Sequence, residues 1–124
     1  MNLFLMVGGL LSALIGIVHS VLGEKLVLRP LFERGEVPKL LGSTAFAHRT
    51  LRFTWHLTTV LLVGIGAVVV DLSRLPPDST STCVLQVLTA TFAVCSLVSL
   101  VGARSKHFSW WVFLIIALLL WLGT

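Results

Sequence analysis

The side chains best able to do chemistry gather in residues 48–56, which read HRTLRFTWH. At 100° per residue, His48, Arg52, His56 and Thr59 fall within about 80° of one another on a helix. This polar stripe leads without a break into the apolar segment 57–70. Imidazole and guanidinium groups donate hydrogen bonds, bind anions and, for histidine, ligate metals. The stripe therefore predicts one half of a binding site where a helix enters a membrane.

A second histidine lies at a matching depth in the first apolar segment. His19 precedes Gly23 by four residues, and His56 follows Arg52 by four. With Gly23 and Arg52 taken as the interface, both imidazoles lie about 6 Å inside the apolar layer. Because ionisable groups are costly there, they are candidates for function. The sequence predicts that His19 and His56, on consecutive antiparallel helices, share one site.

Several ligands fit these groups. An anionic lipid headgroup or a quinone needs hydrogen-bond donors and positive charge, which His56, Arg52 and Arg49 provide. A haem or a divalent metal would be held by His19 and His56. A third metal ligand would come from one of three nearby side chains: Glu24, His48 or His107.

The same residues also have a structural interpretation. The two histidines could hydrogen-bond each other, Ser20, Thr59 or water, and so only fix the register of two helices. The two arginines could anchor a helix end by extending to the headgroups. Glu24 could pair with Lys25 or Arg29 at the surface instead of serving as a base or as support for His19.

The composition indicates a membrane protein of one domain. Of 124 residues, 56% are hydrophobic and 11% are charged, and the mean hydropathy is +1.02. Soluble domains carry about 25% charged residues. The net charge of +4 leaves no soluble basic face, so nucleic acid is not an expected partner. Cys83 and Cys95 lie about 18 Å apart on one predicted helix and cannot pair with each other.

The apolar runs predict an all-α fold, with four transmembrane helices in an antiparallel bundle, at about residues 3–22, 44–72, 83–103 and 108–123. Gly23 is expected to end the first helix, and Ser43 or Thr44 to cap the second. Residues 24–43 should form an amphipathic connection along the interface. A face of small and polar residues on the first helix should let the second approach closely: Gly8, Ser12, Gly16, His19 and Gly23. A weaker stripe on the third helix should face inward: Gln86, Thr89, Ala93, Ser96 and Ala103.

The basic residues predict the orientation. Six of them lie in or beside the first connection, two in the third and only Arg74 in the second. Because basic residues favour the cytoplasmic side, the first and third connections should be cytoplasmic and both termini outside. The expected location is the plasma (inner) membrane, with all four histidines at the cytoplasmic end.

These observations predict a small integral membrane binding or accessory subunit with a polar pocket at the cytoplasmic leaflet. The pocket would take an anionic headgroup, a quinone or a metal. The alternative is a membrane-embedded oxidoreductase in which His19 and His56 hold haem or a metal. Besides the lipid bilayer, the expected partner is a second copy of the chain or another membrane subunit.

Overall fold

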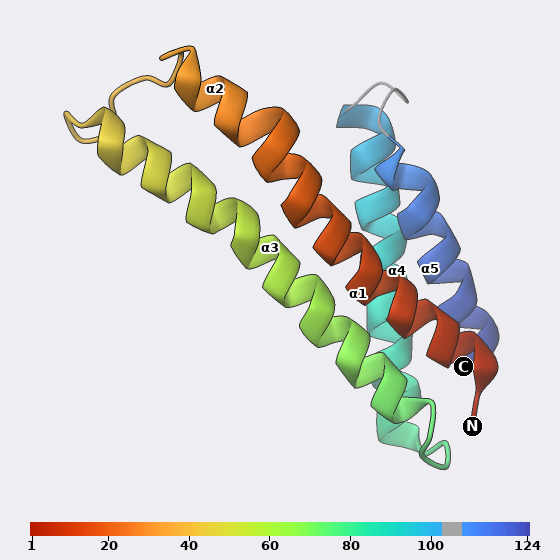
Figure 1. Ribbon diagram of the computed structural model, residues 1–124. Helices are drawn as coiled ribbons and strands as arrows, with labels where there is room; N and C mark the ends of the chain where they lie inside the picture. Colours follow the sequence, from red (N-terminus) through yellow and green to blue (C-terminus); the bar gives the residue numbers. More distant parts are fainter. Residues whose placement is uncertain (103–107) are drawn as a thin grey trace.

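All regular secondary structure in the described residues is helical. The computed structural model describes residues 1–102 and 108–124. Its elements are α1 (Leu3–Leu22), the π-helical turn η1 (Gly23–Leu28), α2 (Arg29–Glu33), α3 (Thr44–Leu72), α4 (Ser79–Gly102) and α5 (Ser109–Gly123) (Figure 1). Within the described residues, strand-like pairing is limited to one isolated bridge between Leu40 and Ser43. The all-α class is confirmed, and three helical segments are long and apolar enough to cross a membrane: Leu3–Glu33, Thr44–Leu72 and Ser79–Gly102.

The expected end of the first helix at Gly23 is wrong. Gly23 has right-handed helical angles (φ −60°, ψ −44°), and α1, η1 and α2 form one continuous helix of 31 residues. Within it, the N–H of Arg29 bonds to the carbonyl of Glu24, five residues back, which widens the helix by one residue. Pro30 follows this turn. Because proline crowds the carbonyl four residues before it, a wider turn relieves that crowding.

The connection to the second long helix is therefore shorter than the expected residues 24–43. It begins after α2, where Gly35 takes a left-handed angle (φ 67°). Leu41 and Gly42 are also left-handed (φ 51° and 80°) and turn the chain into α3. The Ser43 hydroxyl accepts a hydrogen bond from the N–H of Phe46, 3.2 Å away, so the expected N-cap is confirmed.

Helix α4 begins earlier than the expected residue 83. Asp78 caps α4: its carboxylate accepts a bond from the N–H of Ser81 (2.6 Å), and the hydroxyl of Ser81 accepts one from the N–H of Asp78 (2.9 Å). These reciprocal bonds satisfy N–H groups at the helix start. The helix consequently starts at Ser79, directly after the Pro76-Pro77 turn.

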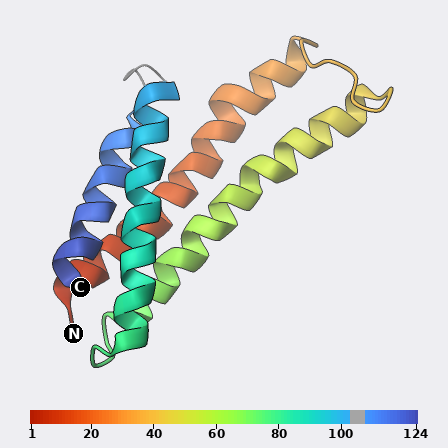
Figure 2. The same cartoon turned by 180° about the vertical axis from the view of Figure 1, so that it is seen from behind.

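The long helices form two hairpins that share one end. The continuous helix α1–η1–α2 lies against α3, and α4 lies against α5. Figures 1 and 2 show the two hairpins meeting beside the chain termini and diverging toward their other ends. Helices within each hairpin are antiparallel, but the hairpins do not lie side by side along their length as a closed bundle would.

The hydrophobic core lies where the hairpins meet. It contains one residue each from α1 and α3, two from α4 and three from α5: Leu5, Val69, Leu85, Phe92, Ile116, Ala117 and Leu120. Asn2 also connects the two hairpins at this end, through hydrogen bonds. Its N–H donates to the carbonyl of Ser73 (2.7 Å), and its side-chain amide donates to the carbonyl of Gly123 (2.9 Å). This one residue therefore connects the start of α1 to the ends of α3 and α5.

The small-residue face of α1 lies against α3, as expected, and at Gly8 it also lies against α5. The hydroxyl of Ser12 donates to the carbonyl of Leu62 on α3 (2.9 Å). A β-carbon at Gly16 would lie 3.2 Å from the carbonyl oxygen of Thr59, and one at Gly8 would lie 2.7 Å from a methyl of Leu120 on α5. Close approach of backbones therefore depends on these small residues, which is the packing that lipid-embedded helices favour.

The stripe expected to face inward on α4 is only partly buried. Ser96 is buried and donates to the carbonyl of Trp110 on α5 (2.8 Å). Gln86 and Ala93, however, are exposed. Ala103 lies outside the described residues. The inward face of α4 is formed by Leu85, Phe92 and Ser96.

Candidate functional site

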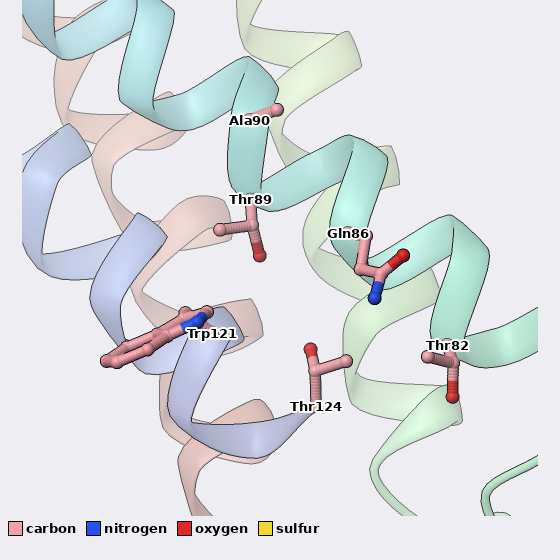
Figure 3. A pocket seen from close by; sticks show the side chains of 6 residues that line it. All are labelled: Thr82, Gln86, Thr89, Ala90, Trp121 and Thr124. Atoms are coloured by element: carbon pink, nitrogen blue, oxygen red, sulfur yellow. The ribbon is translucent and has the colours of Figure 1, made fainter.

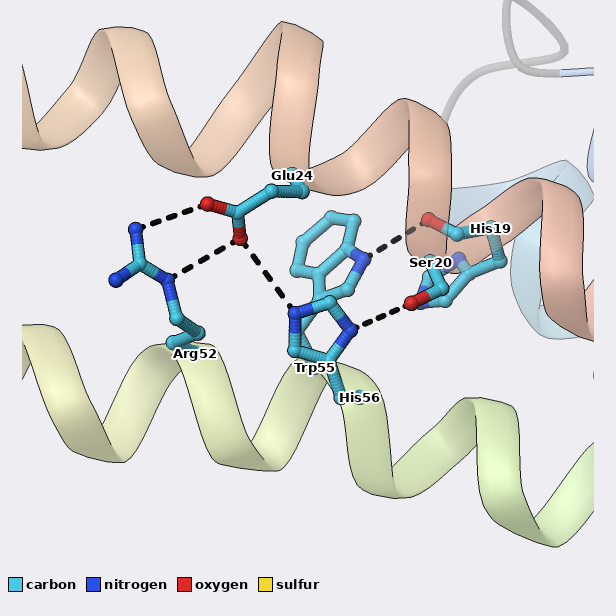
Figure 4. Close-up of polar contacts among 6 residues, drawn as sticks. All are labelled: His19, Ser20, Glu24, Arg52, Trp55 and His56. Carbon is cyan, nitrogen blue, oxygen red and sulfur yellow. Dashed lines mark hydrogen bonds and ion pairs between the residues drawn. The ribbon is translucent and has the colours of Figure 1, made fainter.

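Six side chains from two helices meet where the first hairpin leaves its apolar segment (Figure 4). We call them the Arg52 cluster: His19 and Ser20 of α1, Glu24 of η1, and Arg52, Trp55 and His56 of α3. On each helix they are one turn apart or adjacent, so they line the face toward the other helix. The polar stripe of α3 therefore faces α1, η1 and α2.

Arg52 is held from two directions. Its Nε and Nη2 donate to the two carboxylate oxygens of Glu24, at 3.2 and 2.9 Å. Its guanidinium carbon also lies 5.1 Å from the centre of the Phe32 ring, a cation–π contact. The Phe32 ring in turn stacks on His48, with ring centres 4.3 Å apart. The Arg52 side chain nevertheless remains 49% exposed.

His56 bridges α1 and η1. Its Nδ1 lies 2.5 Å from the hydroxyl of Ser20, and its Nε2 lies 3.5 Å from a carboxylate oxygen of Glu24. The second contact becomes an ion pair when the imidazole is protonated. Both ring nitrogens of His56 thus already have a polar neighbour, and Glu24 is shared between Arg52 and His56.

His19 and Trp55 form the apolar end of the cluster. Their rings stack with centres 4.7 Å apart and planes 5° from parallel. The indole N–H of Trp55 donates to the main-chain carbonyl of His19 (3.1 Å). Gly23 lies directly against the indole, where a β-carbon would overlap the ring. A tryptophan fits between the two helices because the opposing residue has no side chain.

The structure brings together four of the predicted site residues: His19, Glu24, Arg52 and His56. His48 lies beside them, stacked on Phe32. Arg49 is exposed, and within residues 1–102 and 108–124 it has no ion-pair partner. His107 lies outside the described residues.

Phe32 and Trp55 were not predicted as site residues. Trp55 stands in the HRTLRFTWH stretch beside His56, but its importance depends on Gly23 across the interface, 32 positions earlier. Phe32 reaches Arg52 only because the first helix continues past Gly23. The spacing of Phe32 within the continuous helix, two turns after Glu24, is the signal that could have identified it.

The Arg52 cluster contains both a guanidinium, which can bind anions, and side chains of types that can ligate metals. Among the described residues, no group of three His, Cys, Asp or Glu side chains is placed to hold a metal ion. Nε2 of His56 and a carboxylate oxygen of Glu24, 3.5 Å apart, are two metal-ligating atoms without a third from another such side chain in the described residues. The Arg52 guanidinium, in contrast, already presents two N–H groups to a carboxylate, in the geometry that also recognises phosphate.

Comparison of the chain with models of known families, with curated proteins and with solved structures found no match.

Proposed function

We propose that this chain is a small integral membrane binding or accessory subunit whose Arg52 cluster binds an anionic headgroup at the cytoplasmic leaflet. The lengths of the helices support the membrane part of this proposal. At 1.5 Å per residue, the 31-residue helix Leu3–Glu33 is about 46 Å long, which exceeds the roughly 30 Å of bilayer hydrocarbon. One end of the first hairpin must then reach the headgroups.

The charges indicate which end that is. Residues 3–23, 53–70 and 79–102 contain no Asp, Glu, Lys or Arg. Glu24 and Arg52 are the first charged residues met on leaving the apolar part of the hairpin, and five further basic residues follow in residues 25–49. An excess of basic residues favours the cytoplasmic side. The Arg52 cluster thus belongs at the depth of the cytoplasmic headgroups.

The observation that carries the binding proposal is the exposed, oriented guanidinium of Arg52. The Phe32 ring, 5.1 Å from the guanidinium carbon, contacts Arg52 independently of Glu24. A headgroup phosphate or carboxylate could take the two N–H groups that Glu24 now occupies, and a protonated His56 would offer a third. Arg49, one turn away and exposed, adds positive charge. Glu24 is then an internal anion with which the ligand competes.

The test measures which lipids stay bound to the protein after release from nanodiscs made of equal amounts of phosphatidylglycerol and phosphatidylcholine. The wild type should retain phosphatidylglycerol preferentially. Arg52→Lys should lower this preference because lysine cannot offer two parallel N–H groups. Arg74→Lys makes the same change in the other connection and should leave the preference unaltered.

Glu24→Gln distinguishes a headgroup-binding site from an ion pair that only holds the two helices together. If Glu24 competes with the headgroup, removing its charge should raise the retention of phosphatidylglycerol above that of the wild type. If the ion pair only holds the hairpin together, Glu24→Gln and Arg52→Lys should change retention in the same direction or not at all. Either of those results would exclude the proposed site.

A further inference from the structure

A polar hollow lies on the second hairpin, away from the Arg52 cluster. It is lined by four residues of α4 and two from the end of the chain: Thr82, Gln86, Thr89, Ala90, Trp121 and Thr124 (Figure 3). The hydroxyl of Thr89 is buried yet has no hydrogen-bond partner within the described residues. The side chain of Gln86 is exposed beside it. Buried polar groups in proteins normally have partners, so the unpartnered Thr89 hydroxyl requires an explanation.

Gln86 also needs a hydrogen-bond partner, because of its position. It lies seven residues, or about 10 Å, from the start of α4, inside a candidate membrane span that has no charged residue. In hydrocarbon no water is present to bond to an exposed amide, and polar side chains there bond across helices instead. This step rests on the proposed membrane insertion, but not on the proposed headgroup site.

We propose that this face of α4 binds the same face of a second copy of the chain, through hydrogen bonds between the two Gln86 side chains. An amide carries both a donor and an acceptor, as does the hydroxyl of Thr82, so the face is its own complement about a two-fold axis. No ionised side chain on α4 opposes the approach of an identical surface. A ligand that could only donate or only accept hydrogen bonds would match only half of these groups.

The neighbours of Gln86 fit a helix contact. Thr82, Gln86 and Thr89 lie at intervals of four and three residues, which places them along one face of α4. Cys83, one turn before Gln86, is exposed on an adjoining part of the surface. A pair of α4 helices that cross near Gln86 would therefore bring the two Cys83 side chains near each other. Disulfide formation between them can then be used to detect the dimer.

The test measures energy transfer between donor- and acceptor-labelled wild-type chains in liposomes, as a function of the protein-to-lipid ratio. We expect Gln86→Leu to weaken association by roughly tenfold, the order found for interhelical polar bonds in membranes. Gln86→Asn should keep most of the association. Thr91→Val is the control, because the hydroxyl of Thr91 bonds to its own helix at Val87 (2.8 Å).

Oxidation of the membranes provides the second measurement. Disulfide-linked dimers should form through Cys83 in the wild type and in Cys95→Ser. They should be absent in Cys83→Ser and should form more slowly in Gln86→Leu. A chain that stays monomeric at every lipid ratio, or an unchanged association of Gln86→Leu, would overturn the proposal. Because Gln86 is exposed, the helix content of Gln86→Leu, measured by circular dichroism, should match that of the wild type. Extraction of the protein by alkaline carbonate would instead refute membrane insertion itself.

Discussion

Gly23 and Trp55 lie directly against each other across the first hairpin: the indole occupies the space that any side chain at position 23 would need. The contact fixes the spacing of the helices at the point where the Arg52 cluster forms. The stack of His19 on the indole and the bond from the indole N–H to the His19 carbonyl both depend on that spacing.

Gly23→Ala should therefore destabilise the hairpin. The added methyl must displace the indole, and overpacking of this kind commonly costs about 1–3 kcal/mol. The matched control is Gly64→Ala on α3, where a β-carbon would meet no atom within 4 Å. That change should be neutral or stabilising by up to about 1 kcal/mol, since alanine is the better helix former. Thermal unfolding in mild detergent measures both effects. Equal effects would show that the indole of Trp55 leaves room for a side chain at position 23.

The ion pair between Glu24 and Arg52 should contribute little to stability, although it is bidentate. Arg52 is half exposed, and exposed pairs contribute about 0.2–1 kcal/mol. A double-mutant cycle with Glu24→Gln and Arg52→Gln should thus give a coupling energy below about 1 kcal/mol. A coupling of several kcal/mol would show that the ion pair holds the two helices together too strongly for a headgroup to displace Glu24.

The cap of α4 should be sensitive to acid. The hydrogen bond from the Ser81 N–H lowers the pKa of Asp78, and the Ser81 side chain lowers it further. Because the pKa is lower in the folded state, the carboxylate stabilises the helix start above its unfolded pKa of about 3.9, and this contribution is lost as the pH falls through the folded value.

Asp78→Ala should consequently increase hydrogen exchange at Ser81 and Thr82 at neutral pH, and the difference from the wild type should shrink in acid. Asp78→Asn is the control, since asparagine also caps helices and does not titrate in this range. A difference between wild type and Asp78→Ala that stays constant down to acid pH would contradict the role of the charge.

The sequence was sufficient for features that depend on local pattern. The start of α1 and the extent of α3 match the apolar runs, and the Ser43 cap and the close approach at Gly16 follow from residue type and spacing. That Glu24 lies level with Arg52 and His56 on the facing helix could also be inferred, because one turn of helix has a known rise.

Features that depend on contacts between distant residues could not be inferred. A glycine after an apolar run usually ends a helix, but at Gly23 the missing side chain serves the packing of Trp55. The divergence of the hairpins follows from where Asn2 and the core residues join them, which no periodicity reveals. The early start of α4 depends on the side chain of Asp78, which the apolar pattern does not include.

Labelling of single cysteines in intact cells with a membrane-impermeant thiol reagent is the most direct test of the central claim, that the chain spans the membrane with the Arg52 cluster on the cytoplasmic side. Cys83, exposed near the start of α4, should react from outside in a Cys95→Ser background. In a chain without native cysteines, Glu36→Cys, in the exposed connection beyond the cluster, should react only after the cells are opened. Labelling of Glu36→Cys but not of Cys83 in intact cells would place the cluster on the outer face and contradict the account.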